Sequence, residues 1–220
     1  MPLSRRAPLV ALALVSIACG SVAVSLEEGP RRYTADDYED VYERWTRTVD
    51  EFHIGNLEQV IRATATFQSW DFRWAYVVRY AHDFRFSTMQ RTRMLEHALR
   101  DAQEHHRFFL TMSGRYRREA DLTGEQRAWR VLLVNADGDE VEPDRIERVS
   151  RPGAAERIYF PTVSPYRLTF RLSFPVRDPR SGQPFLQPHH RYFTLRFAGA
   201  LGAVDLRWNI FGSGRHARRG

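Results

Sequence analysis

Two pairs of adjacent histidines, His105-His106 and His189-His190, are the residues whose type and spacing could most directly do chemistry. Each pair stands at the start of a predicted strand. If the two strands were neighbours in register, four imidazoles could converge at one rim, and imidazole nitrogens suit zinc, copper or nickel. Adjacent strand residues point to opposite faces, however, so each pair offers only one ligand easily in one direction. Without an HExxH or CxxC motif in support, we interpret them as polar residues at strand ends and expect no metal site.

The sequence lacks the usual arrangements for nucleophilic catalysis. There is no G-x-S-x-G elbow, and Ser113-Gly114 and Ser213-Gly214 are typical of turns. His82 and Asp83 are neighbours on a predicted helix, where such a pair is ordinarily solvated. Phosphate-binding loops require a glycine-rich turn between a strand and a helix, and the sequence has none. We therefore expect neither a catalytic residue nor a cofactor.

The densest acidic cluster has a simple structural explanation. Its members are Asn135, Asp137, Asp139, Glu140 and Glu142. A Ca²⁺ loop places glycine in the sixth position, whereas Gly138 comes fourth here. Asp137-Gly138 is also a strong hairpin-turn signal, because both residues tolerate positive φ. The turn accounts for the cluster without an ion.

Four aromatic residues on one predicted helix raise the alternative of a binding patch. They are Trp70, Phe72, Trp74 and Tyr76. Exposed aromatic side chains could stack on sugar rings or receive an apolar partner. A hydrophobic core would use the same positions, and we favour that interpretation.

The first residues have the composition of an export signal. Residues 1–6 carry two arginines, residues 9–18 form an apolar run of ten residues, and Cys19-Gly20-Ser21 follows. A basic start, a short apolar centre and small residues at its end are typical of a secretory signal. A spanning helix would need about 20 apolar residues, so this run is too short to be one.

Ile17-Ala18-Cys19 resembles the cleavage site of bacterial lipoproteins, although Ser16 stands where leucine is preferred. The resemblance covers only the signal and implies that the Cys19 thiol receives a diacylglyceryl group. Gly20 and Ser21 resemble outer-membrane sorting, since the inner-membrane retention signal usually has aspartate there. The alternative is ordinary cleavage after Ala23, which would release a free protein and discard Cys19. Cys19 is the chain's single cysteine, so the exported fold has no disulfide.

The basic charge of the chain lies largely at its ends. The formal net charge is +6 and every basic side chain, apart from histidine, is an arginine. Five of the 33 arginines belong to the signal and to the terminal tail, so the body nearly balances its 27 acidic residues. A nucleic-acid groove needs basic residues gathered on one face, whereas acids and arginines are interspersed here. We therefore expect no nucleic-acid partner.

The amino-terminal half has mainly helical signals. We divide the chain into a signal (1–19), a tether (20–33), one globular domain (34–211) and a disordered basic tail (212–220). Apolar residues at helical spacing predict a helix from Thr34 to about residue 52, and period-two alternation predicts a strand over 57–68. Ser69 and Ser87 are predicted to cap two further helices. The second of these should bury a stripe made of Met94, Leu95, Ala98, Leu99 and Ala102.

The remainder of the chain is predicted to be almost wholly β. Strands are expected at 107–113, 128–135, 158–162, 166–176, 191–198 and 203–211, with Pro175 ending central pairing. One-sided patterns without βαβ alternation favour antiparallel sheet. The predicted fold is α+β, mainly an antiparallel β-sandwich with an N-terminal helix and a helical insertion between the first two strands.

These observations predict a lipid-anchored cell-envelope protein on the periplasmic face of the outer membrane. Its expected role is a non-enzymatic binding or scaffolding module, whose partners are the membrane and possible further envelope proteins. One alternative is a soluble periplasmic or secreted protein. Another is a His-dependent metal-binding periplasmic protein or hydrolase that uses His105, His106, His189 or His190.

Overall fold

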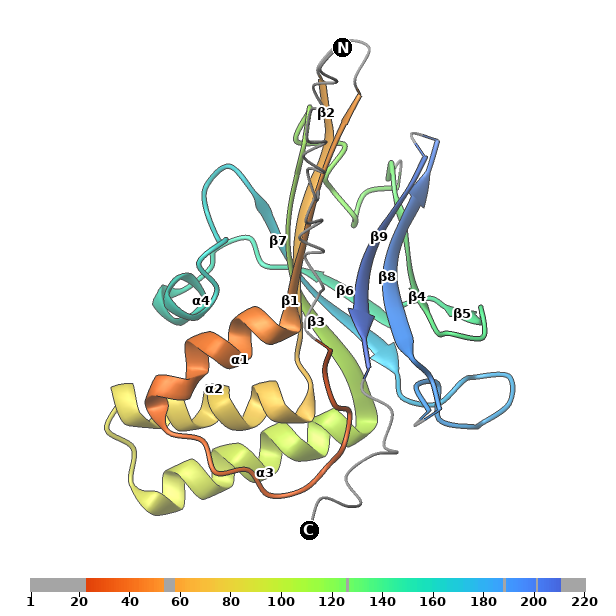
Figure 1. The fold of residues 1–220 in the computed structure, drawn as a ribbon. Coiled ribbons are helices and arrows are strands. Elements are labelled where there is room, and N and C mark those ends of the chain that lie inside the picture. Colours follow the sequence, from red (N-terminus) through yellow and green to blue (C-terminus); the bar gives the residue numbers. More distant parts are fainter. Residues whose placement is uncertain (1–22, 54–57, 126, 188, 201, 211–220) are drawn as a thin grey trace, which may run out of the picture.

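The computed structural model describes residues 23–53, 58–125, 127–187, 189–200 and 202–210 (Figure 1). Cys19, Ser213-Gly214 and the tail 212–220 lie outside the described residues. The elements in chain order are η1 (Ala35–Asp37), α1 (Tyr38–Trp45), β1 (Thr46–His53), β2 (Glu58–Phe67), α2 (Trp70–Asp83), α3 (Thr88–Glu104), β3 (His105–Gly114), β4 (Arg130–Val134), β5 (Glu140–Val141), β6 (Arg145–Arg148), α4 (Ala154–Tyr159), β7 (Leu168–Pro175), β8 (Tyr192–Gly199) and β9 (Gly202–Asn209). No helix in this part of the chain is long and apolar enough to cross a membrane.

The strands form two antiparallel sheets, which confirms the predicted α+β class. The larger sheet has the order β1-β2-β3-β7-β6, and the smaller has the order β5-β4-β8-β9. Helices α1, α2 and α3 gather at one end of the larger sheet, and the smaller sheet lies on its other side (Figure 1). The pair α2–α3 joins β2 to β3, which are the segments predicted as the first two strands. Because the unpredicted β1 precedes them, the helical insertion falls between the second and third strands of the chain.

One hydrophobic core receives aromatic side chains from both sheets. The ring of Phe67 on β2 lies 5.0 Å from that of Phe193 on β8, and Phe108 on β3 lies 5.5 Å from Trp208 on β9. All four side chains are at most 3% exposed. Such ring pairs contribute about 0.5–1.5 kcal/mol beyond the burial of their area. The aromatic contacts therefore join the two sheets.

The first predicted helix is shorter than its apolar pattern indicates. It ends at Trp45, and the chain enters β1 at Thr46. The Thr46 hydroxyl lies 2.8 Å from that of Thr66, and Thr48 and Thr64 form a second hydroxyl pair at 3.0 Å. β-branched side chains and cross-strand threonine pairs favour a strand. The expected helix over 46–52 was therefore wrong, because pairing with β2 outweighs a helical pattern.

The two serine caps are confirmed. Ser69 Oγ accepts the backbone N–H of Phe72 at 3.1 Å, and Ser87 Oγ accepts that of Gln90 at 3.3 Å. The predicted buried stripe on α3 is only half-buried, and no residue of this helix is fully buried. The reason is that α3 packs on α2 at the surface of the molecule (Figure 1).

Two other expectations are corrected. The segment expected as a strand over 158–162 contains the end of α4 instead. The Glu156 carboxylate accepts the Gly153 N–H at 2.8 Å, which caps this helix, and two alanines and Glu156 favour helix in its first turn. Ser113 and Gly114, expected in a turn, are the last residues of β3 and pair with β2.

The last strands follow the sequence closely. β7 ends at Pro175, as expected. Gly138 has φ +89° in the turn between β4 and β5, and Gly202 has φ +119° in the turn between β8 and β9. Glycine adopts such angles without steric cost, so both turns occur where the sequence predicts them.

The first described residues pack against the domain. Val24 is 1% exposed and forms a parallel bridge with Ile210, just after β9. Trp70 Nε1 donates a hydrogen bond to the carbonyl oxygen of Gly29 at 2.7 Å. Residues 23–33, the described part of the predicted tether, therefore lie along the folded domain.

Candidate functional site

The two histidine pairs lie on different sheets. His105 and His106 begin β3 in the larger sheet, whereas His189 and His190 precede β8 in the smaller one. Among the described residues, His189 and His190 join Asp137 in a group whose possible ligand atoms all lie within 4.8 Å of one another. The pair on β3 takes no part in that group. The four imidazoles therefore do not converge, because β3 and β8 are not neighbouring strands.

The hydrogen bonds of His190 define where its proton lies. Its side chain is fully buried, and its Nδ1 lies 3.1 Å from the backbone nitrogen of Gln187. A backbone N–H can only donate, so Nδ1 accepts and the ring proton is on Nε2. Nε2 lies 3.0 Å from Asp137 Oδ2 and donates to it.

This protonation does not suit a metal ion. Imidazole binds a metal through an unprotonated nitrogen, and a metal-bound histidine usually donates its other N–H to an acceptor. In His190 the unprotonated nitrogen, Nδ1, faces the Gln187 N–H. A metal ion on Nε2 would require the ring proton to move to Nδ1, and two hydrogen-bond donors would then face each other. Asp137 and the exposed His189 would then be the remaining metal ligands of this group, with His189 Nε2 3.3 Å from Asp137 Oδ2. Two protein ligands are fewer than the three or four of a zinc site.

The Asp137 group instead joins a turn to a loop. Hydrogen bonds from His189 and His190 lower the pKa of the Asp137 carboxyl below its usual value. Asn135 Oδ1 accepts the backbone N–H groups of Asp137 and Asp139 at 3.1 and 2.9 Å. The acidic cluster is therefore a hairpin turn, as predicted, and it is bonded to the loop before β8.

A cavity of about 390 Å³ lies where β3 begins, and we call it the histidine cavity. His105 and His106 line it together with Phe67 and Trp70 from the junction of β2 and α2. The loop that follows β7 contributes Arg177 and other residues. Its volume is within the range of small-molecule sites, roughly 300–1,000 Å³.

His106 is the unusual group of this cavity. Its Nε2 is buried and has no hydrogen-bond partner among the described residues, and its ring lies 5.8 Å from that of Phe67. Burial, together with the positive charge of Arg73 and the neighbouring His105, lowers the pKa of His106 to about 4. The ring is neutral at pH 7 and can donate or accept a hydrogen bond. An unpaired buried polar group costs about 1–3 kcal/mol, so it marks a place for a partner.

His105 carries a second unsatisfied nitrogen. Its Nδ1 is buried and lies 3.7 Å from Asp101 Oδ1, too far for a hydrogen bond. The two adjacent histidines therefore bring two unsatisfied ring nitrogens to the same end of β3.

The amino-terminal segment forms one wall of the histidine cavity. Leu26 and Glu28 line it, and Gln103 Nε2 donates to Glu28 Oε2 at 3.0 Å. With the bond between Trp70 and Gly29, this contact fixes the segment that follows Cys19 over α2 and α3.

The other sequence candidates lie elsewhere. His82 is 59% exposed on α2, with Nδ1 3.2 Å from Asp83 Oδ1, which fits the solvated pair that we expected. Phe72 is buried in the core, as favoured, and Trp70, Trp74 and Tyr76 are half-buried. Cys19 lies outside the described residues.

Sequence patterns did not reveal the other members of the cavity. Arg177 and Leu186 come from an irregular loop, and Leu26 comes from the segment interpreted as a tether. Periodicity identifies faces of helices and strands but gives no path for such segments. The adjacent histidines were the only signal pointing to this end of β3.

Comparison with protein-family models and with curated proteins gives no match. The chain is similar to the crystal structure of a protein of unknown function from Burkholderia pseudomallei, with 15% identity and a TM-score of 0.35 over 80% of this chain and 90% of that one. This TM-score is too low to establish a shared fold.

Proposed function

We propose that this chain is a lipid-anchored protein of the bacterial cell envelope, on the periplasmic face of the outer membrane, that acts as a non-enzymatic binding or scaffolding module. Its ligand site in this proposal is the histidine cavity. The observation that carries the proposal is His106, which lines the cavity and whose buried Nε2 lacks a hydrogen-bond partner among the described residues. Ligand sites commonly combine apolar walls with a few such polar groups.

The walls of the cavity define the kind of ligand. Phe67, Trp70 and Leu186 supply apolar and aromatic surface, while the neutral His106 offers one hydrogen bond. A compact molecule with an apolar body and a small number of hydrogen-bonding groups matches this lining, which also contains His105 and Glu28. Arg177, whose Nη1 donates to the Gly182 carbonyl at 3.0 Å, adds positive charge at the same cavity.

The packing of Val24 supports a short anchor. Cys19 precedes Val24 by five residues, and an extended chain covers at most about 3.5 Å per residue, or roughly 17 Å in total. Lipid on Cys19 would therefore hold the domain close to the membrane surface. The wall formed by Leu26 and Glu28 belongs to the same segment, so the cavity would lie near the anchored end.

For the arrangement of the two sheets we propose a β-sandwich, as the one-sided strand patterns predict. The aromatic contacts of Phe67 with Phe193 and of Phe108 with Trp208 support it, because they come from facing surfaces of different sheets.

Mass spectrometry of small molecules released from the protein tests the proposed binding. Wild-type protein extracted from native membranes in mild detergent should release a compound close to one per chain. His106→Phe, which removes the ring nitrogen, should release much less, and His82→Phe on the exposed side of α2 is the matched control. Equal amounts from wild type and His106→Phe would contradict the proposal, as would the absence of any retained compound.

The second candidate is a His-dependent metal-binding protein or hydrolase, and the closeness of Asp137, His189 and His190 favours it. Elemental analysis separates the two candidates. Stoichiometric zinc or copper that is lost in both His189→Ala and His190→Ala would replace the binding-module proposal. We expect no stoichiometric metal, because the Nδ1 of His190 is bonded to a donor.

A further inference from the structure

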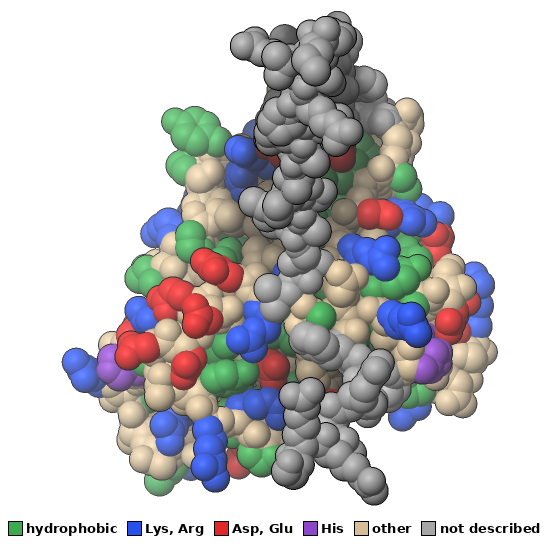
Figure 2. Space-filling view, viewed as in Figure 1, with side chains coloured by type: hydrophobic (Ala, Val, Ile, Leu, Met, Phe, Trp, Pro, Cys, Tyr) green, Lys and Arg blue, Asp and Glu red, His purple; other side chains and the backbone are tan. Residues whose placement is uncertain are grey.

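A second pocket, of about 230 Å³, lies against the outer face of the larger sheet, beside α4 and the segment that leads into β7. Four arginines line it, namely Arg117, Arg148, Arg157 and Arg167, and we call it the arginine pocket. No carboxylate belongs to its lining. On the face shown in Figure 2, by contrast, acidic and basic side chains are intermixed.

Three of the four arginines form no ion pair within 4 Å among the described residues, although Asp121 lies near enough to Arg117, and Asp50 to Arg167, for a longer-range attraction. Arg117 Nη1 donates to the Pro165 carbonyl at 3.4 Å, and Arg157 Nη1 donates to the Pro152 carbonyl at 2.7 Å. These bonds orient the guanidinium groups without neutralising them. Of the four arginines, only Arg148 forms an ion pair with another described residue, namely Asp121 at 2.8 Å.

Arg167 is the half-buried cation of the pocket. Its Nη1 donates to the hydroxyls of Thr64 and Thr111, each at 3.3 Å. Burial, with the neighbouring positive charge of Arg62, lowers the pKa of Arg167 below its usual value, although the carboxylate of Asp50 opposes this shift. A partly desolvated guanidinium whose printed hydrogen bonds go only to neutral hydroxyls is stabilised by an anion bound close to it.

Thr169 gives an independent indication of a ligand. It is 2% exposed and lines the pocket, yet its Oγ1 is buried without a hydrogen-bond partner among the described residues. A hydroxyl can donate one hydrogen bond to an oxyanion. The residue that carries this unused donor therefore lines the same pocket as the four arginines, whose positive charge exceeds that of the aspartates near them.

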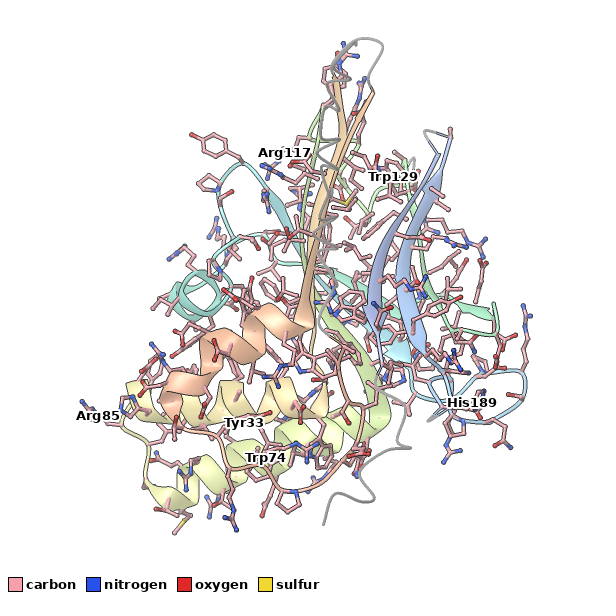
Figure 3. All side chains as sticks on the ribbon, viewed as in Figure 1. Tyr33, Trp74, Arg85, Arg117, Trp129 and His189 are labelled. Atoms are coloured by element: carbon pink, nitrogen blue, oxygen red, sulfur yellow. The ribbon has the colours of Figure 1, made fainter. Side chains whose placement is uncertain are left out.

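We propose that the arginine pocket binds a phosphoryl group. Guanidinium groups match the oxygens of a phosphate in paired hydrogen bonds, and a doubly charged anion suits four arginines opposed by two aspartates, Asp121 and Asp50. The small volume admits a single phosphate-sized group rather than a large molecule. Inorganic phosphate and the phosphate monoester of a lipid headgroup share this chemistry. The site is distinct from the histidine cavity and lies well away from the loop of His189, as the position of Arg117 in Figure 3 shows.

Isothermal titration with inorganic phosphate tests the site in the full chain. Wild type should bind one phosphate saturably, and Arg117→Ala with Arg157→Ala should weaken binding about tenfold or more, since each loses a charge-assisted hydrogen bond. Both arginines are exposed, so the double variant should fold normally. Arg151→Ala, an exposed neighbour outside the pocket, is the matched control and should bind as wild type does.

A second variant tests the buried hydroxyl. Thr169→Val keeps the shape of the side chain and should weaken phosphate binding several-fold without loss of folding. The phosphoryl group could come from free phosphate or from a lipid headgroup. To distinguish these two sources, binding to phosphatidylcholine vesicles with and without phosphatidic acid is compared with binding of free phosphate. Retention on phosphatidic acid alone assigns the site to a headgroup, and binding of free phosphate assigns it to the soluble ion. Binding of neither, or equal binding by wild type and the double arginine variant, would overturn the proposal.

Discussion

The backbone N–H of Val24 donates a hydrogen bond to the carbonyl oxygen of Asn209 at 2.8 Å, at a position where Val24 is 1% exposed. Cleavage after Ala23 would turn this amide nitrogen into a charged terminal ammonium group. Burial of a charge costs several kcal/mol unless it is paired. The structure thus supplies a physical reason to favour cleavage before Cys19, which leaves this nitrogen an amide.

We therefore expect the mature chain to begin at a lipidated Cys19. Metabolic labelling with palmitate should mark the wild type, and Cys19→Ala should lose both the label and membrane retention. Intact-mass measurement gives the site directly. A mature protein that begins at Val24, or an unlabelled soluble wild type, would disprove the anchor.

Val24 itself should contribute to stability. Val24→Ala removes two buried carbon groups and should lower the free energy of unfolding by about 2 kcal/mol. Urea unfolding measures the change, and Glu27→Ala, exposed in the same segment, should be close to neutral. If Val24→Ala has the same free energy of unfolding as wild type, this segment is a tether that does not stabilise the domain.

His106 should make stability depend on pH. Its pKa is about 4 in the folded chain, mainly because of burial, against about 6.5 when unfolded. Between these values only the unfolded chain binds the proton, so stability is full above pH 6.5 and falls as the pH drops towards 4. The loss is roughly 3 kcal/mol over that window.

The comparison of His106→Phe with wild type measures this contribution. Urea unfolding at several pH values should show a weaker dependence between pH 6.5 and 4 in the variant, while His82→Gln should keep the wild-type dependence. An NMR titration in which the His106 ring protonates near pH 6.5 would contradict the prediction.

Asp101 should be important for attaching α3, since this helix buries no residue fully. Its carboxylate pairs with Arg73, whose side chain is 7% exposed, and with Arg107 on β3. Although burial opposes it, hydrogen bonds from Arg107 and Arg73 lower the pKa of Asp101 below its usual value. Asp101→Asn leaves a buried cation unpaired and should cost about 3 kcal/mol in urea unfolding. Glu104→Gln, exposed on the same helix, is the control.

Asp137 should stabilise the loop before β8 only while it is ionised. Its lowered pKa means that this contribution is present at neutral pH and is lost as the pH falls through the folded pKa. Asp137→Asn should therefore be less stable than wild type at pH 7 and approach it in acid. Asp144→Asn, at an exposed site, should differ little at either pH. A difference that is constant with pH would show that the charge is not involved.

Local signals in the sequence determined the parts of the fold whose bonds lie close along the chain. Ser69 and Ser87 begin their helices by accepting N–H groups three residues later, and Gly202 makes the final hairpin with residues beside it. The helical pattern after Trp45 failed because β1 is formed by its partner β2, and the strand expected over 158–162 failed because a cap at Gly153 starts a helix.

Both candidate sites were decided by tertiary structure. The sequence by itself predicted an export signal, which stays a prediction, and an α+β fold with antiparallel strands, and it singled out the histidines that begin β3. The histidine cavity needs residues from the amino-terminal segment, two strands and an irregular loop, and the arginine pocket joins residues as distant as Arg117 and Thr169. Such contacts form only when sheet pairing and core packing bring remote segments together, and no pattern within a few residues records them.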